Sequence, residues 1–134
     1  MIATKSTLKN LKDRLHTNQY IRLGTKHKGD YVLKETIIYI EAYENYTWLH
    51  LKNGSTMLSC KSIGHYEEKF RDNSFIRVHR SYLINLSHVK SYEKKYRLVY
   101  LKGEIVLPIS HRRSRSISKM IRNQEIKIPF QIAV

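Results

Sequence analysis

The stretch that decides the fold is Phe75-Ile76-Arg77-Val78-His79-Arg80-Ser81-Tyr82-Leu83-Ile84-Asn85. Its β-branched and aromatic residues are typical of extended structure, and Ile76 and Val78 would share one face of a strand. Its centre is cationic and polar, however, with two arginines, a histidine and a serine. Packing against a core does not require such side chains. The pattern therefore predicts either a solvated face or contact with an anion.

The charge of the whole chain points the same way. It has 134 residues, enough for one domain with a modest core, and a formal net charge of +14. Such a charge makes a polyanion the expected partner, with nucleic acid ahead of an anionic membrane surface. Residues 29–60 are slightly acidic and the rest of the chain is basic, which predicts a basic face.

Several classes of protein lack sequence support. The single cysteine, Cys60, excludes an internal disulfide, and no apolar run approaches the length of a membrane helix. Residues 1–5 do not resemble a signal peptide, so we expect a cytoplasmic protein without membrane insertion. The histidines lack metal-site spacing, and catalytic and phosphate-loop motifs are missing. The sequence therefore predicts no enzyme activity, no metal and no cofactor.

The first part of the chain reads as a helix followed by strands. Leucines recur with helical spacing in residues 4–16, which form either a lead-in that packs on the core or a docking surface for an upstream receiver domain or regulatory partner. A period near two then runs from residue 19 to residue 58. Asn53-Gly54 between two alternating runs predicts a hairpin with a type I′ turn. Short strands with tight turns indicate a mainly antiparallel β fold.

The second part mixes helices and strands. Residues 60–70 have helical spacing, with Ser59 or Ser62 as the N-cap. We expect strands at 89–93 and 96–101, and a third at 105–109 that ends or lies at an edge because Pro108 cannot donate to a ladder. Ser110 then caps a helix that buries Ile117, Met120 and Ile121. The tail, residues 126–134, is apolar enough to pack or to form an edge strand.

The start of the last helix is a candidate anion site. Three arginines follow Ser110-His111, and cations are unfavourable in the first turn of a helix. Free backbone N–H groups at this end bind phosphate readily. The functional reading is phosphate contact, with His111 or Arg112 reaching a base edge. The alternative is a basic face exposed to solvent.

Two further groups suit nucleic-acid recognition. Arg77 and Arg80 offer planar forks that pair with guanine or with phosphate, and Ser81 can donate to phosphate. Their alternative is surface salt bridges with Glu67, Glu68 or Asp72. Asn45, between two predicted strands, can pair with adenine, although asparagine at a turn commonly bonds to the local backbone.

Four segments in order resemble the LytTR DNA-binding domain of bacterial transcription regulators, over residues 19–122. They are Ile37–Ala42 with Asn45-Tyr46, Lys61-Ser62-Ile63, the 75–85 stretch, and Leu107–Arg112. The resemblance implies an elongated, mainly β fold of small antiparallel sheets with two or three short helices. It also implies loops that insert into successive major grooves of bent DNA, at paired direct-repeat sites occupied by two copies.

The resemblance also implies roles for single residues. Base-reading positions fall at Asn45, at Arg80, and at His111 or Arg112, because the family usually has arginine directly after the serine at 110. His79 would orient its loop by hydrogen bonding. The phosphate contacts predicted from the residues and the resemblance together are Lys61, Ser62, Arg77, Ser81, Ser110 with its amide, Arg113 and Arg115.

The sequence thus predicts a sequence-specific, double-stranded-DNA-binding transcription regulator that forms a homodimer on DNA. Its parts are a basic segment (1–18), the DNA-binding domain (19–122) and a tail (123–134). Most members of the family carry a receiver domain, which needs about 120 further residues. The chain is then either a stand-alone regulator or an excised output domain. The alternative function is a basic RNA-binding or ribosome-associated β module, which the ten tyrosines would suit.

Overall fold

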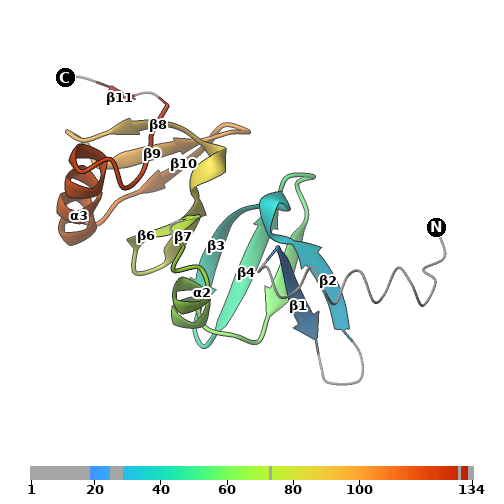
Figure 1. Cartoon of the computed structure of the whole chain (residues 1–134). Helices are drawn as coiled ribbons and strands as arrows, with labels where there is room; N and C mark the ends of the chain where they lie inside the picture. Colours follow the sequence, from blue (N-terminus) through green and yellow to red (C-terminus); the bar gives the residue numbers. More distant parts are fainter. Residues whose placement is uncertain (1–18, 25–28, 73, 130, 133–134) are drawn as a thin grey trace.

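The protein is mainly β, with its strands in three small sheets. The computed structural model describes residues 19–24, 29–72, 74–129 and 131–132. Figure 1 shows an elongated arrangement, with the two-stranded sheet at one end and the four-stranded sheet with α3 at the other. The predicted fold class is therefore confirmed. The predicted helix at residues 4–16 lies outside the described residues.

Two sheets form the N-terminal part. In the five-stranded sheet the order is β5-β4-β3-β7-β6, so β6 lies at an edge. All neighbours in both sheets are antiparallel. The strands are β1 (Tyr20–Gly24), β2 (Gly29–Leu33), β3 (Ile37–Tyr43), β4 (Tyr46–Leu51), β5 (Thr56–Ser59), β6 (Phe75–His79) and β7 (Tyr82–Asn85), with a 3-10 turn, η1 (Lys34–Thr36), before β3.

The third sheet has the order β10-β9-β8-β11. Its β10 is an edge strand that ends at Pro108, as predicted, and β11 pairs with β8 in parallel. The C-terminal segment thus adds an edge strand, which was one of two expected outcomes. The elements are η2 (Leu86–His88), β8 (Val89–Glu93), β9 (Leu98–Leu101), β10 (Ile105–Pro108) and β11 (Gln131–Ile132).

Two α-helices are present in the described part of the chain, and each begins at a serine cap. The Ser62 side chain accepts a hydrogen bond from the His65 amide at the start of α2 (Ile63–Lys69). Ser110 accepts from the Arg113 amide in the same way at the start of α3 (His111–Arg122). Both caps satisfy a backbone N–H that would otherwise lack a partner.

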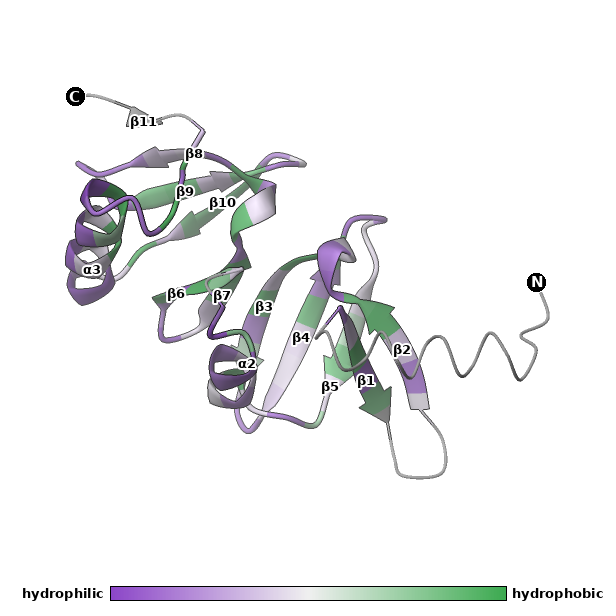
Figure 2. Cartoon of the chain, in the orientation of Figure 1, coloured by the Kyte–Doolittle hydropathy of each residue, from purple (hydrophilic) through white to green (hydrophobic). Residues whose placement is uncertain are grey.

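The apolar residues form two cores that share the central strands. One core lies among β1, β2, one face of the five-stranded sheet and α2, and includes Ile40 and Tyr66. The other lies between the four-stranded sheet and α3 and takes in Val78 and Ile84 of the central hairpin. Figure 2 shows α3 with hydrophobic and hydrophilic stretches along its length, as an amphipathic helix requires.

Two local expectations need correction. The 75–85 stretch is a hairpin of β6 and β7 with Arg80-Ser81 at its turn, whereas the sequence pattern indicated one extended segment. The hairpin predicted at Asn53-Gly54 is present, but its turn is not type I′. Only Gly54 has a positive φ there, of 85°, and its amide donates to the carbonyl of Leu51.

Candidate nucleic-acid interface

The turn of the β6–β7 hairpin presents Arg80 to solvent. Arg80 is exposed, and its side chain makes no hydrogen bond or ion pair with any residue that the structure describes. Beside it, the Ser81 amide donates to Nδ1 of His79 at 3.1 Å. That contact holds the turn from within, which is the orienting role expected for His79. The turn is therefore held in shape by its own hydrogen bond, and it presents the free guanidinium of Arg80.

The β3–β4 turn lies next to this hairpin. The Ala42 amide donates to the Ser81 carbonyl at 2.9 Å, and Glu41 faces Tyr82 in the β3–β7 register. At the tip of the β3–β4 turn, Asn45 is exposed, and its side chain has no hydrogen-bond partner in the described part of the chain. Its amide is therefore not used by the local backbone, and both turns project from one end of the central sheet.

The first turn of α3 is fastened to the same hairpin. Val78 forms a β-bulge between Arg77 and His79, and its carbonyl accepts the Ser110 amide at 2.8 Å. The resemblance implied that this amide contacts phosphate, but in the structure it is bonded inside the protein. Exposed His111 and Arg112 follow directly, so two predicted base-reading side chains lie at the position that Val78 anchors.

Arg77 differs from the other predicted contacts, because its guanidinium faces inward. It donates to the carbonyls of His79 and Arg80 and to the Glu67 carboxylate, and its side chain is only 13% exposed. Burial, followed by the nearby charge of Arg113, lowers the pKa of Arg77, and Glu67 opposes this effect. Arginine nevertheless stays protonated at neutral pH. The salt-bridge alternative describes these contacts, and phosphate binding by Arg77 stays a prediction.

Glu67 links α2 to both neighbouring elements. Its other carboxylate oxygen lies 3.6 Å from the guanidinium of Arg113 on α3, so one acid contacts two cations. Arg113 is half-buried and partly neutralised here. This link fixes the position of α3 relative to β6, and it leaves Arg113 less available to phosphate than exposed Arg115.

The start of α2 supplies the remaining predicted contacts. Thr47, fully buried in β4, donates from its hydroxyl to the Lys61 carbonyl at 3.1 Å. Lys61 and Ser62 themselves are exposed. Because Thr47 is only two residues after Asn45, its hydrogen bond places Lys61 and Ser62 near the β3–β4 turn. The structure thus brings most of the predicted residues to two adjoining hairpin turns and two helix starts.

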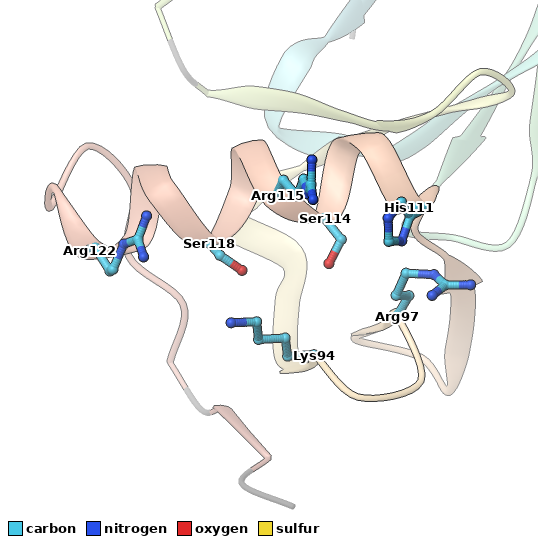
Figure 3. A pocket seen from close by; sticks show the side chains of 7 residues that line it. All are labelled: Lys94, Arg97, His111, Ser114, Arg115, Ser118 and Arg122. Carbon is cyan, nitrogen blue, oxygen red and sulfur yellow. The ribbon is translucent and has the colours of Figure 1, made fainter.

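Sequence reasoning missed one group of cations. Lys94, Arg97 and Arg122 line a hollow of about 330 Å³ together with the predicted residues His111 and Arg115 (Figure 3). The signal in the sequence was the basic pair Lys94-Lys95, which lies between two of the predicted strands. Nothing in the spacing shows that this turn lies against α3.

The described residues form neither a metal-binding cluster nor a membrane-spanning helix. Within the described ranges, no three potential ligand side chains are grouped so as to hold a metal ion. None of the helices described there is long and apolar enough to cross a bilayer. Cys60 is a free, exposed thiol.

Comparison with known proteins finds DNA-binding domains and regulators of transcription. The family model described as the LytTr DNA-binding domain matches residues 31–122. The CO-responsive transcriptional regulator RcoM of Rhodospirillum rubrum is 29% identical over 75 residues, which are 56% of this chain and 31% of that protein. The transcriptional regulatory protein LytR of Staphylococcus aureus is 29% identical over 68 residues, 51% of this chain and 27% of LytR.

A solved structure has the same fold. It is the LytTr DNA-binding domain of a Bacillus cereus protein described as a methyl-accepting/DNA response regulator. The TM-score is 0.66 at 23% identity, and the match covers 77% of this chain and 96% of that one. By contrast, the matches to the curated relatives span less than a third of those proteins.

Proposed function

The chain belongs to the LytTR family of DNA-binding domains, and from this premise we propose that it is a sequence-specific regulator of transcription. It binds double-stranded DNA with the β3–β4 turn, the β6–β7 turn and the first turn of α3. These enter successive major grooves, and Asn45, Arg80 and either His111 or Arg112 read base edges there. Two copies occupy paired direct repeats as a homodimer on DNA.

The observation that carries this proposal is the direct linkage of the three contact points. The Ala42–Ser81 bond joins the two turns, and the Val78–Ser110 bond joins the hairpin to α3. Readers of base edges must be held in fixed relative positions, because a bidentate pair with a base tolerates little displacement. Short backbone hydrogen bonds between the elements supply that rigidity.

Phosphate contacts supply most of the affinity in this proposal. Exposed Lys61, Ser62 and Arg115 surround the base-reading residues, and the Ser81 and Ser110 hydroxyls can donate to phosphate oxygens. In the first turn of α3 the amides of His111 and Arg112 have no acceptor among the described residues. They are available to an anion, which the dipole of this twelve-residue helix also favours.

Selection of bound duplexes from a random DNA pool tests the proposal. We expect a site of two short direct repeats, with the spacing between repeats held constant. Three single alanine variants, at Arg80, Arg112 and Asn45, should each lose base preference at a different position of the repeat. Recovery of no shared motif would contradict the proposal. The positions that relax would also decide between His111 and Arg112.

One observation favours the RNA-binding alternative. Tyr43 and Tyr46 face each other on either side of the β3–β4 turn and are 55% and 45% exposed. Exposed aromatic rings on a sheet can stack single-stranded bases. Competition between a selected duplex and single-stranded RNA of equal length separates the two functions. If RNA displaces the duplex, and Tyr43→Ala abolishes that displacement, the alternative holds.

A regulatory partner completes the proposal. An upstream receiver domain, or another protein bound through residues 4–16, would control occupancy of the site. Deleting residues 1–16 tests this in cells. Loss of regulation with unchanged DNA binding would support a partner at this segment, and unchanged regulation would argue against it.

A further inference from the structure

A basic hollow lies beside the base-reading surface and is built from two elements distant in sequence. On one side is the β8–β9 turn, with Lys94 and Arg97. On the other is α3, and Figure 3 shows the two turn residues facing the helix across the opening. The Ile109 amide donates to the Arg97 carbonyl at 2.8 Å. The turn is therefore fastened to the segment that leads into α3.

The helix presents one continuous stripe to this hollow. His111, Arg115, Ser118 and Arg122 line it, at spacings of four, three and four residues, which place them on one face of a helix. The stripe runs about 16 Å along the axis. It begins at a predicted base-reading residue and leads away from it. A ligand that followed the stripe would extend beyond the bases read at the first turn.

The hollow is also lined by two hydroxyl groups, those of Ser114 and Ser118. The buried Tyr92 hydroxyl lies 3.2 Å from the hydroxyls of both Ser114 and Ser118. Two hydrogen bonds among three hydroxyls use two of their three hydrogens. The third hydrogen can be donated to an acceptor inside the hollow. Phosphate oxygens are such acceptors, and they carry the charge that the surrounding cations require.

The charges around the hollow have one sign. Three arginines and a lysine line it, and no aspartate or glutamate is among its lining residues in the described part of the chain. Each cation raises the energy of the others unless an anion is bound. The contrast with Arg77 is direct, since that residue has a carboxylate partner at 3.2 Å.

We infer that this hollow binds phosphate groups of the DNA strand that flanks the bases read. The inference rests on the proposed function and deepens it, because it assigns a backbone clamp made of the β8–β9 turn and α3. The clamp reads no sequence. It lengthens the contacted DNA, and it adds affinity for specific and random duplex alike.

The test compares two double variants with equal loss of charge. Arg97→Gln with Arg122→Gln removes one exposed cation from each wall of the hollow. Lys90→Gln with Lys119→Gln is the matched control, since both lysines are exposed, lie on β8 and α3, and do not line the hollow. Thermal unfolding checks that both fold. The dissociation constant is then measured against salt for a long duplex and for one trimmed to the bases read.

On the long duplex, we expect the slope of log affinity against log salt to fall by about 2 in the Arg97/Arg122 variant, at about 0.9 per phosphate. The control should match the unmodified protein. On the trimmed duplex, the two double variants should bind alike, because the flanking phosphates are gone. The inference is overturned if the two variants also behave alike on the long duplex.

Two further arms separate the remaining possibilities. Random long duplex is used alongside the selected site, so the slope test does not depend on sequence preference. An absent preference defeats the proposed function, and an unchanged slope defeats only the clamp. Inorganic pyrophosphate is titrated as a free anion. If it binds the unmodified protein but not the Arg97/Arg122 variant, while both bind long duplex alike, the assignment to DNA is wrong.

Discussion

The strand and the turn of the β6–β7 hairpin use arginine in opposite ways. In the strand, the Arg77 guanidinium is enclosed and bonded to Glu67 and two carbonyls. At the tip, three residues later, Arg80 is exposed and without a side-chain partner among the described residues. One cation holds the hairpin in shape, and the other is left to meet an anion. Four measurements can break or sharpen this comparison.

Salt should weaken DNA binding far more than it changes the stability of the fold. If about 6–10 phosphates are contacted, affinity for duplex DNA falls about 10³–10⁵-fold from 50 to 200 mM salt. The free energy of unfolding should change little, because the enclosed Arg77 contacts are screened less than exposed charges. Fluorescence anisotropy and urea unfolding at both salt concentrations measure the two quantities. Affinity independent of salt would remove the electrostatic part of the comparison.

Substituting Arg77 in strand β6 should destabilise the fold. We expect Arg77→Ala to lower the free energy of unfolding by about 2–3 kcal/mol, because hydrogen bonds to a charged group are lost together. The apparent affinities for specific and for random DNA should then fall by the same factor, because only the folded fraction binds. Urea unfolding measures the loss. Arg77→Lys is the informative control, since an ammonium cannot reach three acceptors as the planar fork does, and full recovery would show that charge alone suffices.

Substituting Arg80 at the turn should change the recognition of DNA sequence instead. Arg80→Ala is expected to reduce discrimination at one or two base pairs by about 1–3 kcal/mol. Its free energy of unfolding should stay within about 0.5 kcal/mol of the unmodified protein, as for other exposed positions. Competition with single-base variants of the selected site measures the discrimination. Equal loss on every sequence would make Arg80 a phosphate contact.

Acid should slightly lower the free energy of unfolding, because Asp72, just before β6, loses its charge. Burial acts to raise the pKa of Asp72, but hydrogen bonds from Ser74 and Lys34 outweigh it, and the pKa of this carboxyl is lowered from 3.8. The stability it contributes is present above the pKa of the unfolded chain and lost as pH falls through the lower folded value. Urea unfolding between pH 2 and about 5 measures this. The free energy of unfolding lost at low pH should be smaller in Asp72→Asn than in the unmodified protein. An identical loss would exclude Asp72 as its source.

Much of the fold was predictable because its signals are local. A period near two marks strands, and serine before an apolar stripe of helical spacing marked both helix starts, at Ser62 and Ser110. The hairpin at 75–85 was missed for a related reason. Its turn, Arg80-Ser81, contains no glycine, proline, asparagine or aspartate, and a single serine is only a weak turn signal.

The site was predictable only as a set of residue types. Motif and charge indicated Asn45, Arg80 and the first turn of α3, and the structure brings these onto one surface. The hollow was missed because its two walls, the turn at Lys94 and Arg97 and the helix at Arg115 and Arg122, are separated along the chain. Periodicity reports which residues share an element, and does not report which elements meet.

By itself, the sequence determined the basic charge, the alternation that makes strands, the serine caps and the motif that places the chain among LytTR domains. Only the tertiary structure decided which cations are free. Arg77 and Arg80 are the same residue type in one short stretch, and they differ because Glu67, on α2, folds against one and not the other. A charge becomes available to DNA when no carboxylate of the protein reaches it, and that depends on long-range packing.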